Sequence, residues 1–496
     1  MLLSLTLPPG VFRNGTSFQS QGRFYDADLW RWFEGTQRPI GGWRLKSSDQ
    51  VSGFPRAIHA WADNDTQTWA GIGTNEGLFV YTRSGVMHDV TPVGFVPGPA
   101  NSSTGGGYGF GAYGADLYGT PRPDSNNVIP PMVWTLDNWG ELFIACDGDQ
   151  IYEWKLDTAN PATPLADGSV NPDEEAPTAV SMFVTEEGAI VALGAALDPK
   201  KLEWCDPENR YMWKPSATNL AGGFRVQTQG SLLCGKKIRG GSIIHTDVDC
   251  HLMTYQAGSP DIYEIQRLAS GCGIVSKQAA AVVDSREYWM GANRFWMFDG
   301  SVSPLECDVG DFVFSDINRG QSAKVHATHI SQFGEVWWFY PSSSSLENDR
   351  YVSYNYREQH WSVGSLQRLA GTDKGVFQYP LMVGLDGSLY EHEVGQQRDE
   401  RTPYATSGPI QMGNGETTMS VYSIVPDEQN LGDVQARFTT ADWTMSPETA
   451  EGPFSLTAKT DVRFAGRRVA VKLEADPDKD FRVGEFRFEV KQGTKR

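Results

Sequence analysis

One local pattern recurs along this chain and restricts its fold more than any other feature of the sequence. A short apolar run is followed by a turn of Gly, Asp or Asn, and then by a second run that carries an aromatic residue. This is the outline of a β-hairpin, because Gly, Asn and Asp adopt the backbone angles of tight turns. Clear copies are Trp69–Tyr81, Leu142–Trp154, Ile243–Tyr255, Tyr288–Gly300 and Leu381–Glu391, and looser copies are Ala189–Trp204 and Val336–Tyr354. Amphipathic helical windows are nearly absent, so the sequence predicts an all-β protein.

The second runs of these hairpins begin at a fairly regular interval. They start near Leu78, Ile151, Leu202, Leu252, Phe295, Tyr351 and Leu389, and from Ile151 onward the mean spacing is about 48 residues, close to the period of propeller repeats. A four-stranded blade buries both faces only when it stacks against neighbours around an axis. We therefore predict a β-propeller of six or seven blades. Two consecutive β-sandwiches are the alternative, because the spacings scatter from 38 to 56 residues.

Polar stretches interrupt the repeat and suggest domain boundaries. Residues 97–131 are rich in Gly, Ser, Pro and Tyr, which predicts a long exposed loop, and residues 395–408 precede a change of rhythm. We expect an N-terminal segment (1–45) that closes or flanks the propeller, and the propeller itself over 46–400 with the loop inserted. Over 401–496, alternating apolar residues predict a small C-terminal β-sandwich-like domain or sheet.

Charge and hydropathy exclude several classes of function. The formal net charge is −19, which argues against ordinary nucleic-acid binding, since that binding depends on Lys and Arg displacing counterions from phosphates. The last stretch, 459–496, is basic, with 11 Lys and Arg against 7 Asp and Glu, and is either a solvated face or a patch for an acidic partner. No window approaches the ~18 apolar residues that cross a bilayer, and Met1–Gly10 has no basic leader. We expect neither secretion nor membrane insertion.

The six cysteines indicate free thiols rather than a disulfide framework. Cys146, Cys205, Cys234, Cys250, Cys272 and Cys307 are far apart and contain no C-x-x-C pair. This usage fits assembly in a reducing cytosol. Cys250 beside His251, with His245 nearby, could suggest a metal, but the ligand spacing of zinc sites is missing. We predict no metal and no cofactor.

Sequence motifs of enzyme chemistry fail in their context. Gly109–Gly114 matches the dinucleotide fingerprint but opens no helix, and in Gly230–Lys237 a lysine replaces the hydroxyl residue of a phosphate loop. Leu232 and Leu233 within that second match favour a strand. His326 and His329 would lie on opposite faces of a strand. The carboxylates Asp147, Asp299, Glu306 and Asp386 fall mostly at hairpin turns, so no catalytic residue is predicted.

The abundance of aromatic residues supports one alternative function. Trp289, Trp296, Trp337, Trp338 and Trp361 could stack on sugars, although their strand positions favour packing between blades. A glycosidase also needs two carboxylates within about 5 to 10 Å, which one sequence does not reveal. A glycan-binding or glycan-hydrolysing propeller that recognises a host surface therefore remains the alternative.

The opening of the chain resembles a known family. Leu7–Trp43 is similar to the start of the tail nozzle, or tail hub, proteins of short-tailed bacteriophages. Further similar segments are Trp204–Pro207 with Trp213, Tyr288–Gly291 with Phe298–Gly300, Glu335–Pro341, Glu347–Tyr351 and Ala465–Arg468. These are packing and turn motifs, which mark the family without indicating any chemistry. The resemblance implies a propeller subunit of a virion, without enzymatic activity.

The same resemblance implies an assembly and its partners. Members of the family form a homohexameric ring below the portal and its adaptor, extend the DNA exit channel, and often anchor tail fibres or spikes. We expect this chain in the virion tail, after assembly in the host cytoplasm, where it helps to retain packaged DNA and conducts it during ejection. An acidic wall suits that role, because it repels double-stranded DNA instead of gripping it. The alternative is that the net charge of −19 only maintains solubility.

The Gly- and Tyr-rich loop contains the candidate assembly residues. Tyr108, Phe110, Tyr113 and Tyr118 lie among glycines, so that the loop combines reach with aromatic contact area. We predict that they contact a neighbouring subunit, a fibre or the channel gate, with a disordered loop tip as the alternative.

Overall fold

A computed structural model describes residues 2–104, 128–166, 175–207, 209–259, 262–411, 417–426, 433–443 and 446–493. Strands dominate these residues, and the one α-helix among them, α1 (Gly310–Asp316), has seven residues. The prediction of an all-β protein is confirmed. Within the same residues, no helix has the length and apolar character that crossing a membrane requires.

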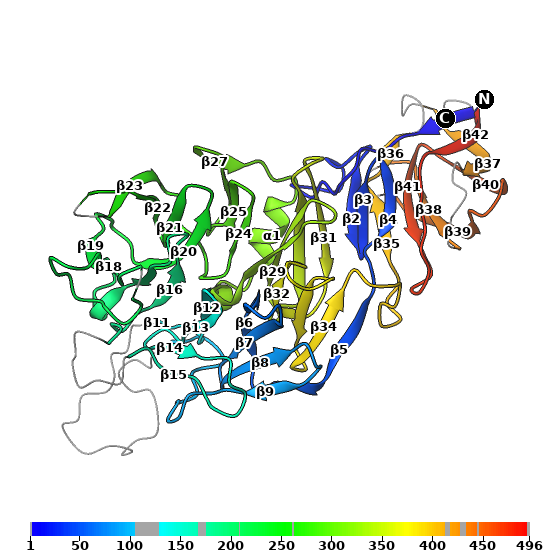
Figure 1. The fold of residues 1–496 in the computed structure, drawn as a ribbon. Coiled ribbons are helices and arrows are strands. Elements are labelled where there is room, and N and C mark those ends of the chain that lie inside the picture. Colours follow the sequence, from blue (N-terminus) through cyan, green and yellow to red (C-terminus); the bar gives the residue numbers. More distant parts are fainter. Residues whose placement is uncertain are drawn as a thin grey trace, which may run out of the picture.

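Seven four-stranded antiparallel sheets make up the larger body of the described chain (Figure 1). The first sheet contains β6 (Pro55–Ala62), β7 (Thr68–Thr74), β8 (Leu78–Thr82) and β9 (Met87–Asp89). The second contains β12 (Thr135–Trp139), β13 (Leu142–Cys146), β14 (Ile151–Trp154) and β15 (Thr163–Pro164). The third contains β16 (Ser181–Val184), β17 (Ile190–Leu193), β18 (Lys201–Trp204) and β19 (Gly222–Arg225). The fourth and fifth are β20 (Leu232–Ile238), β21 (Gly241–Thr246), β22 (Asp249–Tyr255) and β23 (Tyr263–Ser270); and β24 (Ala280–Val283), β25 (Arg286–Met290), β26 (Phe295–Phe298) and β27 (Val302–Leu305). The last two are β28 (His326–Ile330), β29 (Glu335–Tyr340), β30 (Arg350–Asn355) and β31 (His360–Ser365); and β32 (Arg368–Thr372), β33 (Leu381–Gly384), β34 (Ser388–His392) and β5 (Trp43–Gln50).

The first strands of neighbouring sheets lie against one another and form a closed ring. The contacts run through β6, β12, β16, β20, β24, β28 and β32, and β32 meets β6 again. The sheets are therefore the blades of a seven-bladed β-propeller, as predicted, and the alternative of two consecutive sandwiches is wrong for this part of the chain. The seven hairpins recognised in the sequence are the second and third strands of the seven blades.

The seventh blade joins both ends of the propeller sequence. Its outer strand, β5, comes from before the first blade and pairs with β34, with Leu45 opposite Tyr390 and Trp43 opposite His392. Because one sheet holds strands from both ends, the ring cannot open without breaking that strand pairing.

Aromatic rings stack between blades where glycine leaves room for them. A Cβ atom at Gly73 would lie 2.4 Å from the Trp134 ring, and one at Gly71 would lie 2.3 Å from the Phe143 ring. Phe143 also stacks on Trp61, with ring centroids 4.7 Å apart. Glycine on one blade and an aromatic residue on the next thus allow the two sheets to approach closely.

A β-sandwich stands beside the propeller and is built from both termini of the chain (Figure 1). One sheet contains β1 (Leu2–Leu5), β42 (Phe486–Gln492), β37 (Met419–Pro426) and β40 (Thr460–Gly466), and the other contains β2 (Phe24–Asp28), β35 (Tyr404–Ser407), β41 (Arg468–Glu474), β38 (Gln435–Ala441) and β39 (Thr449–Ser455), with β36 (Ile410–Gln411) on β41. The Phe438 ring of β38 packs 4.7 Å from Phe464 and 5.9 Å from Phe488 on the other sheet. Along β41, buried and partly buried residues alternate as the sequence predicted.

Candidate functional site

The segment that carries the family resemblance lies between the propeller and the sandwich. It contains β2 and the hairpin of β3 (Trp30–Phe33) and β4 (Thr36–Pro39), and it continues into the closing strand β5. In Figure 1, β2, β3 and β4 stand between β31 of the sixth blade and β41 of the sandwich, whereas β5 runs beside β34. The backbone N–H of Val11 donates to Trp361 O of β31 at 2.7 Å, and β2 pairs with β35 of the sandwich. We call residues 7–43 the junction.

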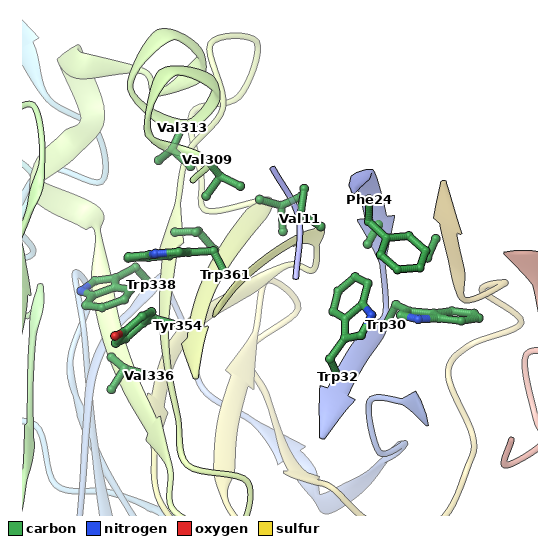
Figure 2. Packing of buried hydrophobic residues seen from close by; sticks show 14 of the residues in the cluster. Val11, Phe24, Trp30, Trp32, Val309, Val313, Val336, Trp338, Tyr354 and Trp361 are labelled. Atoms are coloured by element: carbon green, nitrogen blue, oxygen red, sulfur yellow. The ribbon is translucent and has the colours of Figure 1, made fainter. Parts of the chain in front are cut away.

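Large apolar side chains of the junction belong to one buried cluster that extends into both bodies. Trp338, Trp361 and Tyr354 of the sixth blade belong to the same buried cluster as Val11, Phe24, Trp30 and Trp32 (Figure 2). The Trp30 ring lies 4.4 Å from that of Phe481, which lies between the sandwich strands β41 and β42. The Trp30 carbonyl accepts a hydrogen bond from the Ser362 hydroxyl at 3.3 Å. A continuous core of this kind resists hinge motion between the bodies.

A buried ion cluster fixes the junction against two blades. Arg31 donates two hydrogen bonds to Glu335 of β29, at 2.7 and 2.9 Å, and two to Glu393, which follows β34, at 3.0 and 2.7 Å. Its side chain is 2% exposed. Burial would lower the pKa of Arg31, but the two carboxylates override that effect and raise it above its ordinary value. One cation between two carboxylates demands a single geometry, which sets the position of β3 on the propeller.

A second ion cluster lies at one end of the propeller and joins the first blade to the sixth. Arg56, at the start of β6, donates to both oxygens of Glu347, at 2.6 and 2.8 Å. Lys324, just before β28, donates to the same carboxylate at 2.7 Å. Burial lowers the pKa of Lys324, and the Glu347 carboxylate opposes this shift. Two cations share one carboxylate here, so the local charge is positive.

This second cluster holds the base of the long insertion. Lys324 Nζ donates to Asn101 Oδ1 at 2.6 Å, Arg56 donates to the Ala100 carbonyl at 2.9 Å, and Ser102 exchanges hydrogen bonds with the Gln321 side chain. Beyond it, β10 (Ser103–Thr104) pairs with β11 (Val128–Ile129). The candidate residues Tyr108, Phe110, Tyr113 and Tyr118 lie outside the described residues, as does Gly109–Gly114, so their predicted contacts stay a prediction.

A buried histidine with a lowered pKa, His326, lies beside this cluster. His326 Nδ1 accepts a hydrogen bond from the Asn348 amide at 3.1 Å, and its ring stacks on Phe339 with centroids 4.8 Å apart. Burial and the nearby Arg56 lower the pKa of His326 to about 3. The ring is therefore neutral in the folded chain at neutral pH, with Nδ1 as the acceptor.

The low pKa of His326 leads to a testable pH dependence. Between pH 6.5 and pH 3 the unfolded chain binds a proton that the folded chain does not, so stability falls as pH falls, by about 1.4 kcal/mol per unit. From pH 7 to pH 5, the free energy of unfolding of the wild type, measured with urea, should fall by about 2 kcal/mol more than that of the His326→Gln variant. His88→Gln, on the outer strand β9, should keep the wild-type dependence. Equal pH dependence in His326→Gln and the wild type would refute this assignment.

Several of the residues considered for enzyme chemistry are buried or hold turns. Trp289, Trp337, Trp338 and Trp361 are buried, and three of them donate their indole N–H to backbone carbonyls. These four do not present a ring face to a sugar, and the idea of a sugar platform is wrong for them. Asp147 and Asp386 accept turn N–H groups, as the sequence predicted.

Most residues of the phosphate-loop match and both residues of the histidine pair lie in β-strands. Leu232 to Lys237 lie in strand β20, as the leucine pair indicated. His326 contacts Asn348, whereas His329 contacts Tyr356 and Asp373, so the two rings do not share a site.

The cysteines include one close pair that the sequence did not reveal. Cys250 Sγ of β22 and Cys272 Sγ, which lies between the fourth and fifth blades, are 3.3 Å apart, and both thiols are free. His245 pairs with Glu287 and His251 with Asp249, at 2.9 and 3.2 Å. Among the described residues there is no group of three or more His, Cys, Asp or Glu side chains that could hold a metal ion.

Comparisons with known proteins find matches among solved structures only. No protein family and no curated protein matches the sequence. Among solved structures, an inactive variant of virginiamycin B lyase from Staphylococcus aureus with quinupristin is 7% identical to this chain. The matched region covers 71% of this chain and 99% of the lyase chain, with a TM-score of 0.40. The WD40 domain of Pan2 from Neurospora crassa is 11% identical, covers 70% and 94%, and has a TM-score of 0.37. At these values neither protein informs on ligand or activity.

Proposed function

We propose that this chain is a structural subunit of a short-tailed bacteriophage tail. Copies of it form a homohexameric ring below the portal and adaptor, extend the DNA channel, help to retain packaged DNA and conduct it during ejection. The ring also offers an attachment site for tail fibres or spikes. The work of the subunit is mechanical and electrostatic, and no catalytic step is assigned to it.

The junction is the observation that supports this proposal. Residues 7–43 are the stretch that resembles the nozzle proteins. In the fold they connect the sandwich to the propeller through a shared buried cluster and the Arg31 ion pairs. A ring that holds DNA under pressure needs subunits that do not hinge. A buried arginine with two carboxylate partners serves that need, because it specifies one relative position of the blades and the β3 hairpin.

Charge supports the same role. The chain carries a net charge of −19, and an acidic wall repels DNA phosphates and leaves a hydrated gap for sliding. The glycan alternative loses its main support, since four of the five tryptophans that suggested it are buried.

Locating the chain in the intact particle tests the proposal. An electron-microscopy map should show copies of this two-domain body around the tail axis, directly below the portal and adaptor. A chain that is absent from the particle would contradict the proposal.

A further inference from the structure

A polar cavity at the centre of the propeller is separate from the junction and from the insertion base. Its volume is about 310 Å³, and its walls come from the first strands of five consecutive blades, β6, β12, β16, β20 and β24, and from the residues just before β24. The charged and polar side chains of its lining include His59, Asp137, Lys236, Lys237, Lys277 and Gln278. Since first strands surround it, the cavity lies on the propeller axis.

Positive charge exceeds negative charge in this cavity. Three lysines face one carboxylate, Asp137, which is already engaged by Lys237 Nζ at 3.1 Å and by the Val184 N–H at 2.9 Å. Lys277 Nζ instead donates to the Val180 and Val133 carbonyls, at 2.6 and 3.4 Å. Lys236 Nζ lies 3.5 Å from Gln278 Oε1. Neither Lys236 nor Lys277 forms an ion pair within the described part of the chain.

The surroundings of Lys277 make an unpaired ammonium unfavourable. Lys277 is half-buried in the cavity wall, and burial lowers the pKa of its ammonium group. A desolvated cation gains most from an opposite charge at hydrogen-bond distance. The carbonyl dipoles around Lys277 are weaker partners than a full negative charge. In a chain with a net charge of −19, two unpaired ammonium groups at the centre of the ring therefore stand out as a site for an anion.

We propose that the axial cavity binds a small oxyanion with two or more negative charges, and that Lys236 and Lys277 are its cationic ligands. Each ammonium has three donors and can contact an oxyanion oxygen while it keeps one protein acceptor. A volume of about 310 Å³ holds an anion of the size of pyrophosphate and excludes duplex DNA. Because Lys236 belongs to β20 and Lys277 precedes β24, the anion links the fourth blade to the fifth. This proposal does not depend on the role in a phage tail.

Calorimetric titration of the full chain with pyrophosphate tests the site, at constant ionic strength kept with sodium chloride. The wild type should bind one pyrophosphate per chain. Lys277→Met and Lys236→Met should each weaken binding about tenfold or more, since each removes one charge-assisted contact. Lys374→Met removes the same charge from an exposed position on the seventh blade and should bind like the wild type.

Two results would overturn the proposal. One is the absence of saturable binding to the wild type up to about 10 mM pyrophosphate, where even a weak specific site would be occupied. The other is wild-type affinity in both cavity variants. If Lys277→Met does not fold, the pyrophosphate affinity of Lys236→Met tests the proposal alone. That variant is expected to fold, because the Lys236 side chain forms a single polar contact among the described residues, at 3.5 Å, with Gln278.

Discussion

Replacing Arg31 by methionine is expected to lower the free energy of unfolding by about 3 to 5 kcal/mol. Methionine preserves much of the buried volume, so the loss is mainly electrostatic. Glu335 and Glu393 would face each other in the junction without a cation, and burial already raises the pKa of Glu335 in the presence of Arg31. The loss should appear in urea unfolding at pH 7 as a lower transition midpoint.

Removing the carboxylates as well should restore stability. In the triple variant Arg31→Met, Glu335→Gln and Glu393→Gln, no buried charge is left unpaired, so we expect a large part of the loss to be recovered. Arg225→Met is the matched surface control, because the Arg225 side chain is 60% exposed and the change there should be much smaller. A triple variant that is as unstable as the single one would mean that the cluster contributes packing rather than charge pairing.

The second large effect is expected for Trp30→Ala. The indole is 1% exposed and contacts Phe481, while the residue's carbonyl accepts the Ser362 hydroxyl of the sixth blade. Truncating a buried tryptophan costs about 3 to 5 kcal/mol, because contacts are lost and a cavity remains. Here the cavity would open between the propeller and the sandwich, so the coupling of the two bodies should weaken as well.

Scanning calorimetry separates these two consequences. The wild type should unfold in one transition, and Trp30→Ala should show two, with the sandwich melting first. Trp443→Ala is the control, since this tryptophan of the sandwich is 57% exposed and its removal leaves the junction intact. If Trp30→Ala still unfolds in one transition near the wild-type temperature, the junction is not what couples the two bodies.

The repeat was predictable because its signals are local. In Tyr288–Gly300, two strands and their turn fit within thirteen residues, and alternation and turn residues are enough to recognise the hairpin. The same signals found the middle strands of every blade. They also predicted the alternation in β41, where Val469, Val471 and Leu473 are buried.

The long-range pairings left no such signal. Strand β5 pairs with β34, and Arg44 lies opposite Glu391, 347 positions further along the chain. Strands β1 and β2 likewise pair with strands near the C-terminus. Local patterns show that a segment is a strand, but they do not show which distant strand it pairs with. The edge of every sheet offers the same backbone hydrogen-bond donors and acceptors.

The candidate site was only partly visible in the sequence. The resemblance drew attention to residues 7–43, yet the partners of Arg31 are 304 and 362 positions away. An arginine between Trp30 and Trp32 on a strand was the available hint, since a charged residue flanked by core residues needs a buried partner. Lys236 and Lys277 had no hint at all, because their common cavity exists only after the blades close into a ring.

Electron microscopy of the particle that is proposed to contain this chain tests the central proposal most directly. Six copies are expected around the tail axis below the portal and adaptor, each with the junction closed as in the isolated chain. Copies placed away from the path of the genome, or a junction that opens between subunits of the ring, would contradict it.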